Sequence, residues 1–320
     1  MKTYLVSVLT RSRRLFVDLV KTMLPVMVIV QIASELGLVG FLAKSVGPLA
    51  ALGGLPAEAG IVWITCALTG IYGGVGALLG LASSMTLDMA QFNALCTMML
   101  FAHFLPVEQA VVRKAGVNLW ITGALRLVVG LAYAAVVTWL SRLTGLLSQP
   151  ADLSRLAVPS PAEAGYLAWI LDTARSFAML FVVIAGLLVL LDILDRTGIT
   201  RRITRLLEPL LRVSGLDASV APVTTVGVLL GLTYGGALII QEAREKVFPP
   251  RTRFLALTWL SLSHSLLEDT AIMLAIGADV VVVLVGRVLV TLLVVGLLAK
   301  LLARLPEDAV WRWFLSRAAA

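Results

Sequence analysis

The sequence has few charged side chains. Asp, Glu, Lys and Arg make up 14% of its 320 residues, against about 25% in an ordinary soluble domain. Apolar residues make up 59%, and the mean hydropathy is +0.97. This composition excludes a soluble globular fold and predicts an integral membrane protein with the lipid bilayer as its surroundings.

Cysteine and histidine are also scarce, with two of each. Cys66 and Cys96 both lie in apolar runs, so no disulfide framework is indicated. The motifs of serine hydrolases, zinc proteases and nucleotide-binding loops are absent. We therefore expect no enzyme, no cofactor and no ATP-driven engine.

The net charge of +7 does not indicate a nucleic-acid partner. The basic residues stand beside hydrophobic runs instead of forming one patch with aromatic side chains between them. These runs are about as long as the 20 residues that a helix needs to cross a bilayer, and they lack the alternation of a membrane β-barrel. The predicted fold class is an all-α integral membrane protein.

The chain contains an internal repeat with an offset of 161 residues. The matched pairs are Gly37 with Gly198, Pro48 with Pro209, Gly54 with Gly215, Gly70 with Gly231, Thr97 with Thr258, His103 with His264, Gly116 with Gly277 and Arg126 with Arg287. One pair consists of the only two histidines. We therefore predict two duplicated halves, residues 1–160 and 161–320, joined by a linker at about 149–161.

Each half shows the same order of segments. The predicted segments are a long apolar helix (16–34; 167–192), a shorter amphipathic one (38–52; 199–213), a Gly-broken run (60–82; 219–241) and two further helices (91–112 and 117–140; 253–276 and 280–303). The Gly-broken runs read "ALTGIYGGVGALLG" and "LLGLTYGGALII". Because each central Gly costs a continuous helix about 1 kcal/mol, each run is either a re-entrant hairpin or a kinked span.

Loop charge favours the hairpins. If each half crosses three times and the second half is inverted, nearly every basic cluster falls on one side of the membrane. The N- and C-termini are then cytoplasmic, and the location is a bacterial inner membrane. Inverted repeats with helices broken near the midplane are common in secondary transporters.

With these features the chain resembles the nucleoside recognition, or Gate, domain family. That family is seen in concentrative nucleoside transporters, in the membrane part of ferrous iron transporter B and in spore maturation proteins A and B. The similarity rests on "GIYGG" and "GLTYGG", on the polar-interrupted helix after each, and on the duplication. It implies two hairpins and two partly unwound helices that meet at a central site.

The resemblance also points to particular residues. The implied hairpin tips are Gly70, Gly73 and Gly74 in the first half, and Gly231, Tyr234, Gly235 and Gly236 in the second. The implied binding region is the polar run from Ser261 to Thr270. The first-half segment "LFAHFLPVEQA" keeps His103 and Glu108 but lacks the serine of the second half, so we do not expect two symmetric sites.

The polar run "SLSHSLLEDT" carries the predicted binding chemistry. On a continuous helix, Ser261, His264 and Glu268 share one face, and Ser265 and Asp269 lie on the adjoining face. Ionisable groups inside a membrane span indicate function by default. The candidate substrate or ion ligands are His264, Glu268, Asp269, Ser261, Ser265, Thr270, His103, Glu108, Arg126 and Arg287.

Two of these assignments have simpler alternatives. Arg126 and Arg287 either balance the buried carboxylates, hold an anion, or extend to the nearest membrane interface. Cys96, Met99 and His103 share a helical face that would suit a soft metal, but such faces more often serve packing. We assign no metal ligand.

The function that the sequence favours is transport of a small polar or ionic solute, nucleoside-like or an organic anion. The site would lie at the midplane between the hairpin tips and the broken helices. A divalent metal permease is one alternative, and a non-transporting membrane module that works with a partner protein is another. The sequence is also compatible with a homo-oligomer.

Overall fold

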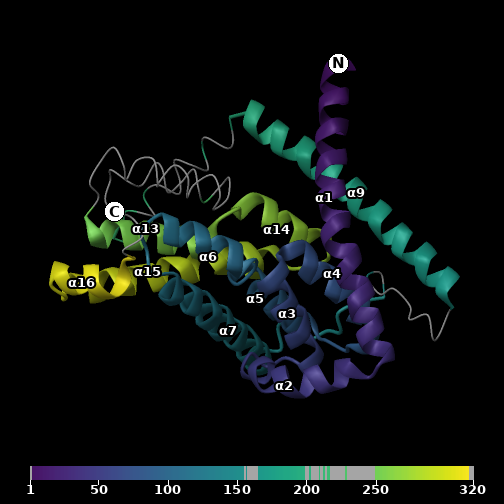
Figure 1. Cartoon of the computed structure of the whole chain (residues 1–320), viewed down its shortest axis with the longest axis horizontal. Coiled ribbons are helices and arrows are strands. Elements are labelled where there is room, and N and C mark those ends of the chain that lie inside the picture. Colours follow the sequence, from purple (N-terminus) through teal and green to yellow (C-terminus); the bar gives the residue numbers. More distant parts are fainter. Residues whose placement is uncertain are drawn as a thin grey trace.

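The predicted all-α class is confirmed. The computed structural model describes residues 2–154, 156, 165–198 and 249–316, with single residues at 202, 209, 212, 215, 216 and 228. Every regular element in these ranges is a helix (Figure 1). In the first half they are α1 (Lys2–Glu35), α2 (Leu38–Leu52), α3 (Ala57–Thr69), α4 (Ile71–Leu81), the 3-10 turn η1 (Ala82–Ser84), α5 (Met89–Phe101), α6 (Leu105–Lys114) and α7 (Leu119–Thr144). In the second they are α9 (Tyr166–Arg196), α13 (Pro250–Ser263), α14 (Leu266–Ala275), the π-helical turn η2 (Val281–Gly286), α15 (Arg287–Ala303) and α16 (Glu307–Phe314).

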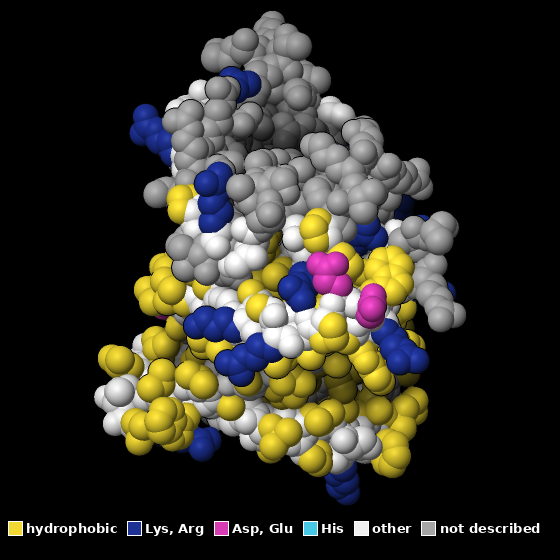
Figure 2. All heavy atoms as spheres, turned by 90° about the vertical axis from the view of Figure 1, so that its left-hand side faces the viewer, with side chains coloured by type: hydrophobic (Ala, Val, Ile, Leu, Met, Phe, Trp, Pro, Cys, Tyr) yellow, Lys and Arg dark blue, Asp and Glu magenta, His cyan; other side chains and the backbone are white. Residues whose placement is uncertain are grey.

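Several of these helices are long and apolar enough to cross a membrane. Among the described residues they are Met89–Lys114, Leu119–Thr144 and Val281–Ala303, with the bent pair Met23–Glu35 and Leu38–Leu52 as a fourth candidate. Their outer faces expose large apolar side chains, for example Val128 and Leu293, each 61% exposed. Figure 2 shows such side chains over much of the described surface on one face, with several Lys and Arg side chains across its middle. The expected count of six crossings stays a prediction.

The broken helix Met89–Lys114 lies at the centre of the molecule. Of its most apolar stretch of 18 residues, 67% is buried inside the protein, whereas 22% of the corresponding stretch in Val281–Ala303 is buried. α5 packs on α7, α13 packs on α15, and these pairs lie side by side in Figure 1, while α1 crosses α9 at the edge. The central position of α5 is what places the polar residues that follow it out of contact with lipid.

The first Gly-broken run forms a hairpin. A Cβ added at Gly74 would lie 2.5 Å from the Cβ of Cys66, although the two residues are eight apart in the chain. In a continuous helix that spacing corresponds to about 12 Å. The chain turns back at Gly70, whose φ of 95° is a conformation that side-chain-bearing residues rarely adopt.

Several backbone features recur at the offset of the sequence repeat. The glycine pairs Gly37 with Gly198, Gly54 with Gly215, and Gly116 with Gly277 all have positive φ in both halves. The turns of the two halves are therefore alike where both are described. The domain boundary and the inversion of the second half relative to the bilayer stay predictions.

Two of the predicted helices are broken in the structure. The predicted helix 91–112 is divided into α5 and α6, and 253–276 is divided into α13 and α14. The predictions of continuous helices from periodicity were wrong because the backbone leaves helical geometry beside a histidine in both, in keeping with the two partly unwound helices that the family resemblance implied. The second hairpin, with Gly231, Tyr234, Gly235 and Gly236, and most of the segment 199–213 lie outside the described residues.

The hairpin contact makes a testable prediction. We expect Gly74→Ala to lower the free energy of unfolding by about 1–3 kcal/mol, because its new methyl group overlaps Cys66. Adding Cys66→Gly should recover part of that loss, since it removes the atoms in the way. Thermal melting in detergent would measure both, with Gly296→Ala, which has open space, as the control. Equal melting of Gly74→Ala and wild type would contradict the hairpin.

Candidate functional site

Two helix breaks form the backbone of the candidate site. Between α5 and α6, Phe104 adopts left-handed geometry with φ 47°, and between α13 and α14, Ser265 does so with φ 48°. The two residues are separated by the repeat offset. Left-handed geometry costs a residue with a side chain about 1–2 kcal/mol. Both halves carry this free-energy cost at equivalent positions. The two helix breaks are therefore a feature of the repeat.

A histidine stands at each break, and the two imidazole rings meet. The Nδ1–H of His103 donates to the carbonyl of Met99 over 3.0 Å, and that of His264 donates to the carbonyl of Leu260 over 2.8 Å. The Nε2 atoms of the two rings lie 3.0 Å apart. His103 is 5% exposed and His264 2%. The site is therefore shared between the two halves of the chain.

Two fully buried arginines hold the carbonyl groups that the breaks leave without helical partners. Arg126, on α7, donates to the carbonyls of Phe101 over 2.6 Å and His103 over 3.0 Å. Arg287, at the start of α15, donates in the equivalent way to Leu262 over 3.1 Å and His264 over 3.2 Å. Both guanidinium groups are buried at these carbonyls, which does not fit the alternative in which the arginines extend outward to the nearest membrane interface.

The carboxylates complete the arrangement. Glu108, in the first turn of α6, accepts from Arg126 through Oε2, and its Oε1 lies 3.0 Å from Nε2 of His264 and 3.2 Å from Nε2 of His103. Asp269, in the first turn of α14, has Oδ2 3.7 Å from Nε2 of His103 and 4.0 Å from Nη1 of Arg287. Each carboxylate thus faces the arginine of its own half and a histidine of the other.

We call these six residues the central cluster. They are His103, Glu108, Arg126, His264, Asp269 and Arg287. All six are buried, the most exposed being Glu108 at 8%. They can bind a cation between the rings and the carboxylates, exchange a proton, or meet a polar solute.

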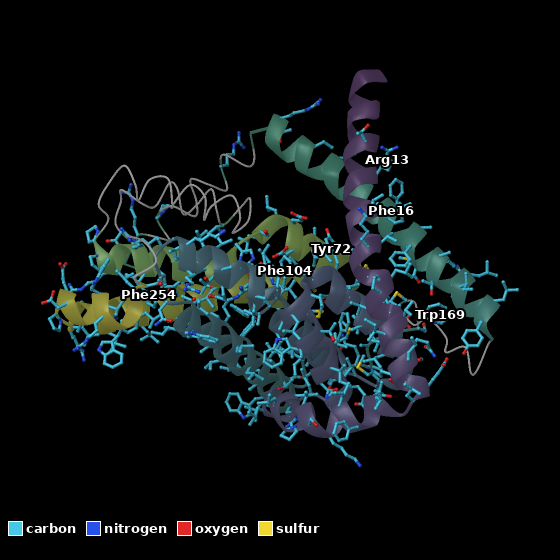
Figure 3. The ribbon with its side chains drawn as sticks, viewed as in Figure 1. Arg13, Phe16, Tyr72, Phe104, Trp169 and Phe254 are labelled. Carbon is cyan, nitrogen blue, oxygen red and sulfur yellow. The ribbon has the colours of Figure 1, made fainter. Side chains whose placement is uncertain are left out.

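The hairpin tip contacts both helix breaks. The backbone N–H of Phe104 donates to the carbonyl of Cys66 over 3.1 Å, and a Cβ at Gly70 would meet the Phe104 ring. On the same hairpin, the phenol of Tyr72 lies close to the carboxylate of Glu268 on α14. Figure 3 places Tyr72 and Phe104 near the middle of the molecule. Tyr72 therefore links the first-half hairpin to the second-half helix.

The remaining predicted residues lie around the cluster. Ser261 and Thr270 are buried with hydroxyl oxygens that have no hydrogen-bond partner among the described residues. Ser265 provides the left-handed turn, as described above. The predicted stripe of Ser261, His264 and Glu268 on one helical face is wrong, because α13 ends at Ser263, before His264, and α14 begins at Leu266.

Some of the site escaped sequence reasoning. The offset that pairs the histidines also pairs Glu108 with Asp269, but sequence reasoning did not use this match. Pro106 stands in the first turn of α6, a position typical of a helix start, and signalled the break after His103. Tyr72 gave no signal of its own. The ligand atoms of His103, Glu108 and His264 lie within 4.8 Å of one another, a set that sequence reasoning did not assign to a metal.

Comparisons with known proteins give a family match and a relative. Residues 177–279 match the family model Gate, described as nucleoside recognition, and the match includes His264 and Asp269. An "uncharacterized membrane protein YvoD" of Bacillus subtilis (strain 168) is 24% identical over 295 residues, which cover 91% of this chain and 92% of the relative. No solved structure matches this chain.

The arginine contacts lead to a stability prediction. Arg287→Met should lower the free energy of unfolding by about 3–5 kcal/mol, because it leaves a carboxylate and several carbonyls buried without a donor. Thermal or denaturant unfolding in detergent would measure the loss. Arg304→Met, at an exposed position after α15, is the matched control and should change little. A variant at Arg287 that unfolds like wild type would show that its contacts are not structural.

Proposed function

We propose that this multi-pass membrane protein, whose residues 177–279 match the Gate, or nucleoside recognition, family model, is a secondary-active transporter. Its substrate would be a small polar or ionic solute, nucleoside-like or an organic anion. It would lie in a bacterial inner membrane with both termini in the cytoplasm. The observation that carries the proposal is the central cluster, in which each half contributes a histidine, an arginine and a carboxylate to one buried site.

The free-energy cost of burying the charged groups of the central cluster supports a functional role. Charged groups inside a membrane protein are expensive and are typical of substrate or ion pathways. Here they stand at two helix breaks, the arrangement in which transporters bind substrates near the midplane. A purely structural core would bury apolar side chains of the same volume at lower cost.

The hairpin supplies a way to open and close the site. Tyr72 joins the hairpin to Glu268, and Phe104 joins it to the first helix break. Separating these contacts would free the first turns of α6 and α14, whose N–H groups favour anionic or polar ligand groups. The solute would enter as the contact between Tyr72 and Glu268 opens, and closure would bring the hairpin back over it.

One observation favours the metal permease as a second candidate. Two imidazoles and one carboxylate converge within 4.8 Å, which is a ligand set for a divalent cation. For the partner-dependent module, the described residues offer no comparable observation.

The contact between Tyr72 and Glu268 leads to a prediction about transport. Uptake would be measured in proteoliposomes with nucleosides, nucleobases, organic anions and divalent metals. Glu268→Gln and Tyr72→Phe should each change the uptake rate at least about 10-fold, which corresponds to about 1.4 kcal/mol in the activation barrier. The melting temperature should change little, since neither residue belongs to the central cluster. Glu307→Gln, at an exposed position on α16, is the control.

Uptake that both variants leave unchanged would contradict the role of the contact between Tyr72 and Glu268. A wild-type protein that melts cooperatively yet takes up no compound of the panel would contradict the transporter and favour the partner-dependent module.

A further inference from the structure

The two facing ring nitrogens in the central cluster carry no hydrogen. A backbone carbonyl can only accept, so the Nδ1 atoms of His103 and His264 must carry the hydrogens in their bonds to Met99 and Leu260. In a neutral imidazole the other nitrogen is then an acceptor. The two Nε2 atoms, 3.0 Å apart, therefore present lone pairs to each other.

Carboxylate oxygens add to this concentration of acceptors. Oε1 of Glu108 lies 3.0 and 3.2 Å from the two Nε2 atoms, while the guanidinium of Arg126 is on the other oxygen, Oε2. Oδ2 of Asp269 is buried without a hydrogen-bond partner among the described residues. Three acceptors thus face one point, with Asp269 beside it, and no described donor lies within hydrogen-bond distance of that point; the nearest to Asp269 is Nη1 of Arg287, 4.0 Å from Oδ2. A cation at this point would satisfy the three acceptors together.

We propose that Nε2 of His103, Nε2 of His264 and Oε1 of Glu108 bind one divalent transition-metal ion of the Zn²⁺ or Fe²⁺ class, with Asp269 as the fourth ligand. Imidazole and carboxylate together suit these ions better than Mg²⁺ or Ca²⁺, which prefer all-oxygen sites. Binding of the ion stands independently of transport. Its role, as cargo or as coupling ion, rests on the proposed function.

The distances fit an ion in tetrahedral coordination. Ligands at 2.0–2.1 Å from such an ion are separated by about 3.3 Å. The three observed separations are 3.0, 3.0 and 3.2 Å, so only a small expansion is needed. Asp269 lies farther from the histidines and would complete the site by a side-chain movement.

The surroundings of the three ligands also match a metal site. Ligating histidines almost always donate their second ring N–H to a carbonyl or carboxylate, which fixes the tautomer. His103 and His264 both do so, through the carbonyls four residues earlier. The ligating carboxylate is oriented in the same way by Arg126.

A shared proton is the competing occupant. One proton between the two Nε2 atoms would remove their repulsion, but it lies on a line between two atoms. It would leave Glu108 Oε1 without a donor of its own, and Asp269 Oδ2 with only the distant Nη1 of Arg287. An ion with three or four ligands serves all of these atoms together, and this is why the geometry favours the metal.

Metal binding can be measured on the purified full chain in detergent. After removal of metals with a chelator, Zn²⁺ titration should give one ion per chain, and Co²⁺ should give the intense visible absorption of a tetrahedral site. His103→Asn and His264→Asn should each weaken binding at least about 100-fold, since loss of an outer-shell partner alone costs 10- to 100-fold. Cys96→Ser, buried on the same helix as the Met99 carbonyl, should bind as wild type does.

The outcomes separate the two proposals. Absence of stoichiometric binding by the cooperatively folded wild type would overturn the metal site and favour a shared proton, as would equal Zn²⁺ affinity in the histidine variants. If a histidine variant fails to fold, the stoichiometry and Co²⁺ spectrum of the wild type still decide. One ion bound without transport of any solute would support the metal site and count against the transporter. Transport with no bound ion would support the transporter and overturn the metal site.

Discussion

The structure depends on one requirement, that polar groups removed from water must find partners inside the protein. Breaking a helix in a membrane protein frees carbonyl groups, and each would cost several kcal/mol if left alone in hydrocarbon. Arg126 and Arg287 meet that requirement by donating to the carbonyls at the two breaks. Their charges in turn require carboxylates nearby, and Glu108 and Asp269 stand there.

The same requirement ties the two halves together. Each carboxylate faces a histidine of the other half, so neither half completes the cluster alone. Hairpin contacts through Phe104 and Tyr72 extend this dependence to a segment whose movement would expose the site. In the proposed transport cycle, a change of occupant at the cluster would therefore be linked to a change in the relative position of the halves.

Sequence reasoning reached some parts of this arrangement and missed others for physical reasons. Composition gave the membrane class, and the offset of 161 residues paired His103 with His264 before any contact was known. The family resemblance implied two broken helices, but the positions of the breaks were missed because neither Phe104 nor Ser265 is a residue that usually permits left-handed geometry. The meeting of Glu108 with His264 was missed because helical periodicity describes neighbours within one helix and says nothing about residues 156 apart.

The most direct test of the account is whether positions 103 and 264 face each other in the folded chain. In a Cys66→Ser, Cys96→Ser background, His103→Cys and His264→Cys would be joined by a short bifunctional thiol reagent, with a protease site placed in the linker. The account predicts that the two halves stay linked on a denaturing gel after cleavage, while single-cysteine variants separate. Separation of the halves in the double variant, with both thiols shown to have reacted, would contradict it.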